Sequence, residues 1–298
     1  MLENYKKSKN KESYILRISL IILCFIFFNL VLVANLLTVK EQQFSYLAKS
    51  LLSGKTYFVE QLETWNDTVP LENRHYWPLG PFPAIILMPF VALFRAIGIF
   101  FYQGYLQFFL VIAVFRLVFM IARKCMYTIW DSLFLAFAFC AASAFLVVAV
   151  LPLSWYFSHV ITVTLLFLIL NEYLGKKRYW LIGTMVALIL LTRLPAAFVI
   201  VFFIIEILFL YKNTLSKKIN DVATLVTPCF IGLFFFFIYN YVRFGNFFEQ
   251  GYSLQLLQNI LSEARDRYGL LSLRHIPEPT AYTGKSLLSI YKLSYANI

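Results

Sequence analysis

Five of the fifteen carboxylates in this chain lie in one polar stretch, residues 40–80, between two apolar regions. They belong to Glu41, Glu60, Glu63, Asp67 and Glu72. A carboxylate can act as a general acid or base, and a long polar loop beside an apolar run is uncommon unless it has a function. The stretch is therefore predicted to form one half of an active site. The alternative is a solvated connector whose aromatic residues rest at a bilayer surface.

Two arginines further along the chain stand where a charge is costly in lipid. Arg193 lies between two short apolar runs, so it is predicted to line a polar cavity. Arg243 follows the last long apolar run, where it either contacts a ligand or anchors a helix end at the lipid headgroups. His159 stands just past Trp155 and Tyr156 and is interpreted as a structural residue at the interface.

The composition indicates a membrane protein with several spans. Hydrophobic residues make up 61% of the chain and charged residues 14%, and the mean hydropathy is +0.74. Soluble domains are nearer half apolar and a quarter charged. The net charge of +11 does not indicate a nucleic-acid partner, because the Lys and Arg residues cluster in short connections between apolar runs. That pattern is typical of topology signals and of contacts with lipid headgroups.

The sequence contains no pattern of metal ligands. Its four cysteines lie far apart, in or beside apolar runs, so neither a disulfide framework nor a zinc site is predicted. The histidines at 75, 159 and 275 have no ligand spacing either. A divalent cation held by carboxylates stays open, and no other cofactor is predicted.

The apolar runs predict an all-α, polytopic membrane helix bundle of about seven spans. Residues 1–13 carry four lysines and are predicted to be a cytoplasmic tail. The run 14–37 is too long for a signal peptide and is interpreted as a retained first span. Six more spans are predicted near residues 103–122, 131–150, 156–174, 179–192, 196–211 and 222–242. The compact Lys/Arg groups then fall inside, and the polar loops 40–102 and 243–285 fall outside.

Two short helices are predicted inside the first outer loop. Apolar residues at helical spacing between Phe44 and Leu52, followed by Gly54, predict an amphipathic helix in the interface plane. The run 81–101 is interpreted as a re-entrant or juxtamembrane segment, because three prolines and Arg95 make a poor straight span. If this run crossed the bilayer, the later basic groups would lie outside.

The second outer loop brings further acids to the same face. It contains Glu249, Glu263, Asp266 and Glu278, so nine of the fifteen carboxylates are predicted on one side of the membrane. Residues 286–298 begin an apolar run that is too short to span. The chain is therefore expected to be one membrane domain, 1–298, whose carboxyl-terminal part is missing.

Four stretches resemble the GT-C class of integral-membrane glycosyltransferases, in the branch of protein mannosyltransferases and aminoarabinose transferases. Glu41–Gly54 is similar to the juxtamembrane helix that follows the first span in that class. His75–Pro83 resembles its aromatic–proline approach to a second such helix, and Leu191–Pro195 resembles its arginine–proline turn. Asn240–Asn246 followed by Glu249–Tyr252 is the most specific match.

The resemblance implies that a sugar moves from a polyprenyl-phosphate carrier to a lipid, glycan or protein acceptor at the outer face. An acid in the first outer loop would take the acceptor's proton, and cationic and aromatic groups would hold phosphate and sugar. The implied catalytic residues are Glu41 and Asp67. The implied substrate-binding residues are Arg193, Arg243, Tyr252, His75 and Trp77. Glu41 and Arg193 are expected to meet in one outer-facing cavity, as general base and phosphate anchor. The class typically has an Asp/Glu pair where this chain has Glu41 alone.

Alternatives remain open for the residues and for the function. Glu41 would also suit the amino-terminal dipole of an interfacial helix, and Asp67 would also suit an ordinary turn. A transporter or lipid flippase is disfavoured, because no internal repeat is found. A non-catalytic membrane protein of the same fold stays open. The expected partners are a polyprenyl-phosphate sugar, membrane lipid and a partner subunit if the short chain is genuine, and the expected location is a bacterial plasma membrane.

Overall fold

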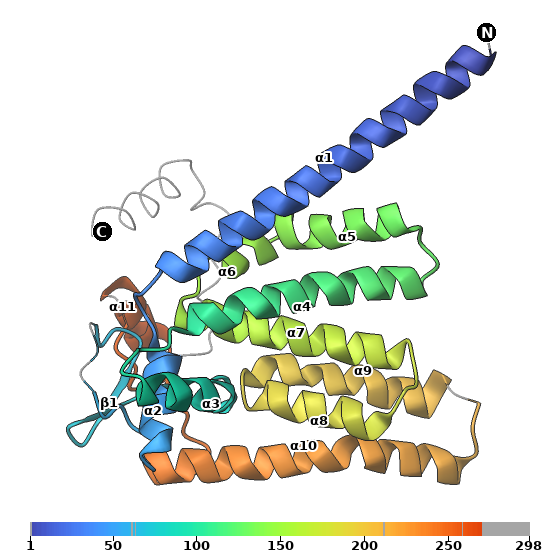
Figure 1. Ribbon diagram of the computed structural model, residues 1–298. Helices are drawn as coiled ribbons and strands as arrows, with labels where there is room; N and C mark the ends of the chain where they lie inside the picture. The colour runs from blue at the N-terminus through green and yellow to red at the C-terminus, as the bar shows by residue number, and fades with distance from the viewer. Residues whose placement is uncertain (1, 61, 63, 211, 258, 270–298) are drawn as a thin grey trace.

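The long helices of this chain lie side by side in one bundle, and the short elements gather at one end (Figure 1). The computed structural model describes residues 2–60, 62, 64–210, 212–257 and 259–269. In that part of the chain the only strands, β1 (Val69–Leu71) and β2 (Arg74–Tyr76), form one antiparallel hairpin. The predicted all-α class is confirmed.

Four helices are long and apolar enough to cross a bilayer, by length and composition. They are α1 (Leu2–Leu37), with the apolar part Tyr14–Leu37, α4 (Gln103–Lys124), α7 (Ser154–Tyr173) and α10 (Leu215–Phe244). A bilayer span takes about twenty apolar residues in a helix. The fold is therefore that of a helical membrane protein.

The predicted number of about seven spans is too high for the described residues, because three of the predicted runs do not give helices of spanning length. Run 131–150 divides into α5 (Ile129–Ala141) and α6 (Phe145–Val150). Run 179–192 gives α8 (Tyr179–Leu190), which has 12 residues. Run 196–211 becomes the 3-10 turn η1 (Leu194–Phe198), the short α9 (Val199–Ile205) and the π-helical turn η2 (Glu206–Leu210).

Local polar chemistry explains the break between α5 and α6. The Ser143 hydroxyl donates to the Phe139 carbonyl (2.6 Å), and the Phe145 N–H donates to the same hydroxyl (3.1 Å). A serine side chain that bonds neighbouring backbone groups competes with the helical ladder. The hydropathy of run 131–150 contains no information about these serine bonds. The run therefore predicts one long helix where the structure has two shorter ones.

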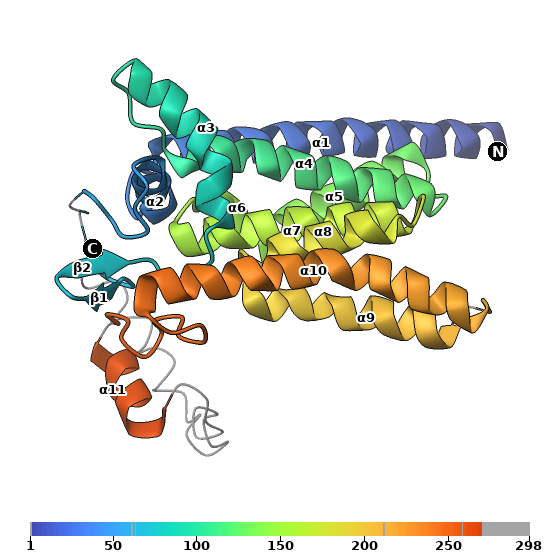
Figure 2. The same ribbon diagram turned by 90° about the horizontal axis from the view of Figure 1, so that it is seen from below.

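The two ends of the bundle differ in charge. The loop end carries α2 (Gln43–Leu52), α3 (Phe82–Ala96), the hairpin and α11 (Asn259–Tyr268) (Figures 1 and 2). At the basic end lie the carboxyl-terminal end of α4, the connection from α7 to α8 and the amino-terminal end of α10. Its basic residues are Arg123, Lys124, Lys176, Lys177, Arg178, Lys217 and Lys218. The basic groups predicted to share one side of a membrane thus lie at one end of the bundle.

Helices α2 and α3 pack against each other at the loop end. Phe44, Leu47 and Ala48 of α2 are fully buried, as the predicted amphipathic pattern requires. Ser45 and Ser50 are also fully buried, so α2 is covered by protein on more than one face. Helix α3 has 15 residues and lies at an angle to the long helices (Figure 2), which agrees with the interpretation that run 81–101 is not a straight span.

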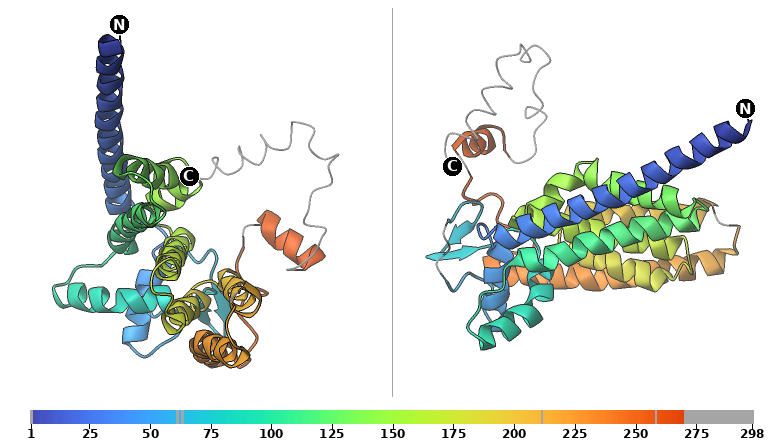
Figure 3. Two further views of the ribbon diagram at one scale, coloured as in Figure 1. Left: turned by 90° about the vertical axis from the view of Figure 1, so that its right-hand side faces the viewer. Right: turned by 45° about the horizontal axis from the view of Figure 1, so that its top comes forward.

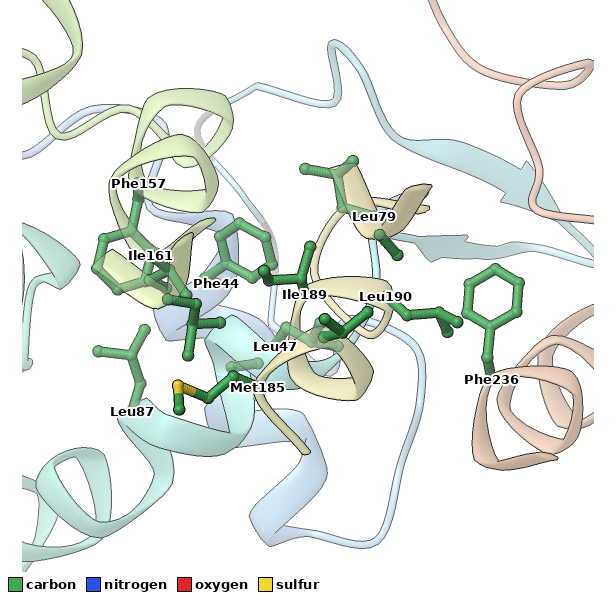
Figure 4. Close-up of a cluster of buried hydrophobic side chains, with 14 of the residues drawn as sticks. Phe44, Leu47, Leu79, Leu87, Phe157, Ile161, Met185, Ile189, Leu190 and Phe236 are labelled. Atoms are coloured by element: carbon green, nitrogen blue, oxygen red, sulfur yellow. The ribbon is translucent and has the colours of Figure 1, made fainter. Parts of the chain in front are cut away.

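A hydrophobic core fixes these loop-end helices to the bundle (Figure 4). Its members include Phe44 and Leu47 of α2, Leu87 of α3, Phe157 and Ile161 of α7, Met185 and Ile189 of α8, and Phe236 of α10. Protein interiors are close-packed, so elements that share a core are held firmly relative to one another. The core therefore holds in place the helices next to which the candidate functional residues lie.

Gly183 allows α8 to approach α10 closely. A Cβ atom at this position would lie 2.0 Å from the Leu225 carbonyl oxygen. Gly183→Ala is therefore expected to destabilise the bundle by about 1–3 kcal/mol, the usual cost of overpacking. The measurement is the midpoint of thermal unfolding in detergent. Thr184→Ala, one position along the same helix, is the control and is expected to change stability by about 0.5 kcal/mol or less; equal midpoints for the two variants would contradict the close contact.

Candidate active site

Trp155, in the first turn of α7, contacts two of the predicted site residues. Its indole Nε1–H donates a hydrogen bond to Asp67 Oδ2 (3.1 Å). The Arg193 guanidinium lies against the same ring, 5.7 Å from the ring centroid. One indole therefore joins a carboxylate from the first long loop to an arginine from the turn after α8.

Asp67 is held in place by the segment that follows α10. Its backbone is left-handed (φ 63°), and its N–H donates to the Leu256 carbonyl (2.7 Å). The Leu256 N–H donates to the Thr68 carbonyl (2.8 Å), and the Gln255 amide donates to the Asp67 carbonyl (3.2 Å). The two loops that the sequence assigns to one face are thus bonded to each other, and the second loop positions the candidate acid of the first.

Arg193 is a partly buried cation, and no ion pair of the described residues includes it. Its Nη1 lies 2.8 Å from His159 Nε2 and 3.3 Å from Ser158 Oγ. Because a guanidinium can only donate, His159 Nε2 accepts, and the imidazole is neutral with its proton on Nδ1. Burial lowers the pKa of Arg193, but an arginine remains charged at neutral pH. An uncompensated cation held in this way can bind an anion.

A cavity of about 440 Å³ lies beside Arg193. Its polar lining comes from Thr192, Arg193, Gln250 and Tyr252. Its apolar lining comes from Pro78, Leu79, Leu190, Leu194, Pro195 and Phe236. The volume falls within the range of small-molecule sites. This lining suits a ligand that has both an anionic group and an apolar part.

The wall of this cavity depends on a close approach at Gly80. A Cβ atom there would lie 2.0 Å from the Leu191 carbonyl oxygen. The same carbonyl accepts a hydrogen bond from the Phe82 N–H (3.1 Å). The segment before α3 therefore packs directly on the turn that carries Arg193, and only glycine fits at the contact.

Tyr252 and Arg243 lie next to each other but differ in access to the cavity. Tyr252 lines the cavity. Burial raises the pKa of the Tyr252 hydroxyl, while the charges of Arg193 and Arg243 lower that pKa. Arg243 is 3% exposed and donates to the Trp77 carbonyl (2.6 Å) and to Asn240 Oδ1 (2.6 Å). Arg243 thus ties the segment before α3 to the end of α10 from behind the cavity wall, and its direct contact with a substrate stays a prediction.

Glu41 lies in a tight turn between α1 and α2. Its backbone is left-handed (φ 54°), and its carbonyl accepts from the Ser154 hydroxyl (2.7 Å) and the Gln103 amide (3.2 Å). Its exposed side chain lines a hollow of about 10 Å³, which among the described residues shares no lining residue with the cavity beside Arg193. Glu41 and Arg193, predicted to meet in one cavity, therefore line separate hollows.

The pKa values of the Glu41 and Asp67 carboxyls are both raised, and the charge of Asp67 contributes to the shift of Glu41. Desolvation by the surrounding protein raises the pKa of Glu41, the charge of Asp67 raises it further, and Lys40 lowers it. Burial also raises the pKa of Asp67, and the hydrogen bond from Trp155 partly offsets this. A raised pKa makes a carboxylate a stronger base at neutral pH. The fold thus places a second acid, Asp67, near enough to Glu41 for its charge to raise the pKa of Glu41.

His75 and Trp77 hold the hairpin and its neighbouring segment, and neither lines the cavity in the described part of the chain. Thr68 donates its hydroxyl proton to the Trp65 carbonyl (2.5 Å), so His75 Nδ1–H must donate to Thr68 Oγ1 (2.9 Å). The His75 ring stacks on Trp65, with centroids 4.0 Å apart. Trp77 is fully buried, and its ring centroid lies 5.6 Å from that of Trp155.

Trp155, Ser158 and His159 are not among the site residues predicted from the sequence. These three positions lie on one face of a helix, because residues three and four apart are neighbours there. A Trp–Ser–His stripe at the start of an otherwise apolar span was the available signal. Histidine beside aromatic residues near a bilayer surface usually has a structural role, which is the role that the sequence favours for His159.

The fold and the site define a helical membrane protein whose loop end combines paired carboxylates with a partly buried arginine. No group of three or more His, Cys, Asp or Glu side chains in the described part of the chain is arranged to hold a metal ion. Comparison with protein-family models, with curated proteins and with solved structures finds no match. The resemblance of the four sequence stretches to the GT-C class accordingly stays a prediction.

Proposed function

We propose that this protein is a membrane glycosyltransferase that moves a sugar from a polyprenyl-phosphate carrier to a lipid, glycan or protein acceptor. The observation that carries the proposal is the placement of Trp155, which hydrogen-bonds Asp67 and lies against Arg193 beside a largely apolar cavity. A carrier of this kind presents a phosphate next to an isoprenoid chain. A cation beside apolar walls is complementary to both parts.

In the proposed reaction Arg193 stabilises the leaving phosphate and Asp67 acts as general base. The acceptor oxygen forms a bond to the anomeric carbon of the sugar, while the bond from that carbon to the phosphate oxygen breaks. Arg193 stabilises the negative charge left on the carrier phosphate, and the planar guanidinium suits a phosphate group. Asp67, with Glu41 as the second acid of the pair, takes the proton from the acceptor.

The proposed orientation follows the positive-inside rule. The basic end of the bundle would lie in the cytoplasm together with the amino terminus, and the loop end would face outward in a bacterial plasma membrane. The shorter apolar helices α5, α8 and α9 run alongside α4, α7 and α10 (Figure 1) and would lie in the same apolar layer. Donor and acceptor would then meet at the outer face.

The hydrogen bond from Trp155 to Asp67 is expected to affect how the rate of sugar transfer depends on pH. That bond lowers the pKa of Asp67, so Trp155→Phe is expected to raise it. A general base works only when deprotonated, and a higher pKa moves the acid limb of the pH–rate profile to higher pH. The same limb in Trp155→Phe and wild type would show that Asp67 is not the titrating base. Trp65→Phe is the control, because Trp65 stacks on His75 instead.

The direct test is transfer of a radiolabelled sugar from a polyprenyl-phosphate donor in membranes that contain the protein. Transfer by wild type and its loss in Asp67→Asn support the proposal. Binding of the donor without transfer to any acceptor class would favour a non-catalytic protein of the same fold. Movement of the intact labelled lipid across the bilayer, again without transfer, would indicate a transporter.

A further inference from the structure

A groove between α1 and α5 lies at the basic end of the bundle, away from the candidate active site. Its volume is about 770 Å³, and its apolar walls come from Leu16, Leu20, Leu23, Phe134 and Phe137. Figures 1 and 3 show α1 diverging from the other helices toward its amino terminus. This divergence leaves Leu16 and Phe134 largely exposed on the two sides of the groove.

The polar lining of the groove contains a cation that lies against an aromatic ring and pairs with no carboxylate among the described residues. The Arg17 guanidinium lies 5.1 Å from the ring centroid of Trp130, and it forms no hydrogen bond or ion pair with any residue that the structure describes. Asp131 also lines the groove, but its carboxylate accepts from the Thr128 hydroxyl (2.6 Å) in the first turn of α5. The dipole of that helix offsets the charge of a carboxylate at its start. No residue that the structure describes therefore occupies the donors of Arg17.

We propose that this groove binds a phospholipid with an anionic headgroup. The headgroup phosphate would contact Arg17, and an acyl chain would lie along the apolar faces of α1 and α5. Tryptophan and arginine are typical of the level of the lipid headgroups, and basic pockets between membrane helices on the cytoplasmic side bind anionic lipids. The inference is independent of the proposed transferase activity.

Native mass spectrometry of the full chain in detergent tests the proposal. The protein is titrated with phosphatidylglycerol or with phosphatidylcholine of the same acyl chains. Wild type is expected to retain phosphatidylglycerol in preference. Arg17→Gln is expected to lower that preference about fivefold, the effect of one basic residue near an anionic surface. Lys217→Gln removes the same charge at the basic end but outside the groove, and it is expected to leave the preference unchanged.

Two further variants separate charge from shape. Asp131→Asn removes a negative charge from the groove and is expected to raise the preference for phosphatidylglycerol. Leu20→Trp fills the groove while keeping Arg17, and it is expected to reduce retention of both lipids. Equal retention of the two lipids by wild type, or equal effects of Arg17→Gln and Lys217→Gln, would overturn the proposal. A dimer that dissociates in Leu20→Trp without a change in lipid retention would also overturn it, since a second copy would then cover the groove.

Discussion

Replacement of Asp67 by asparagine is expected to lower the rate of sugar transfer by about 10²–10⁴-fold, the usual contribution of a positioned general base. Asparagine keeps the size of the side chain, and its carbonyl oxygen can still accept the bond from Trp155, so the loop is expected to stay in place. The rate is measured with a radiolabelled polyprenyl-phosphate donor in membranes. Donor binding is expected to stay at the wild-type level, because Arg193 is intact.

Glu41→Gln is the matched control for this result. Glu41 is the other acid of the pair, but its side chain lines a separate hollow, so a smaller loss of transfer is expected. The reverse order, with transfer lost in Glu41→Gln and retained in Asp67→Asn, would make Glu41 the base. Wild-type rates in both variants would remove the enzyme proposal altogether.

Replacement of Arg193 by alanine is expected to weaken binding of the lipid donor by about 10–150-fold. The reason is that hydrogen bonds to a charged group contribute about 1.5–3 kcal/mol. Arg193 is partly buried, lines the cavity and has no carboxylate partner among the described residues, so its charge is available to a phosphate. The measurement is the dissociation constant of the labelled donor for the purified protein. Transfer is expected to fall as well.

Two controls make the Arg193 result specific. Arg193→Lys keeps the charge but loses the planar fork, so it is expected to bind the donor with intermediate affinity. Arg95→Ala removes an exposed arginine from the last turn of α3, outside the cavity lining, and is expected to bind the donor like wild type. Equal donor binding by Arg193→Ala and Arg95→Ala would contradict a phosphate anchor at Arg193. It would not bear on the predicted loss of transfer in Asp67→Asn.

The sequence by itself determined the class of protein and the placement of its charges. The length of an apolar run and the position of a lysine are local properties, so the helical membrane fold and the basic end could be predicted. The helix that starts near Phe44 could also be predicted, because its apolar spacing is local. The number of spanning helices could not, since the bonds of Ser143 divide run 131–150, and run 196–211 begins in a 3-10 turn and ends in a π-helical turn.

The tertiary structure alone decided which candidate residues are neighbours. The sequence identified Glu41, Asp67 and Arg193 by residue type, but it paired Glu41 with Arg193 and gave Trp155 no role. In the structure Asp67 and Arg193 contact the same indole, Trp155, because the segment around Leu256 bonds the first loop and brings its carboxylate to that ring. Asp67 and Trp155 lie far apart in the chain, so the hydrogen bond between them forms only when the packed core holds their two segments in place. Patterns of hydropathy and charge carry no information about which loop packs on which.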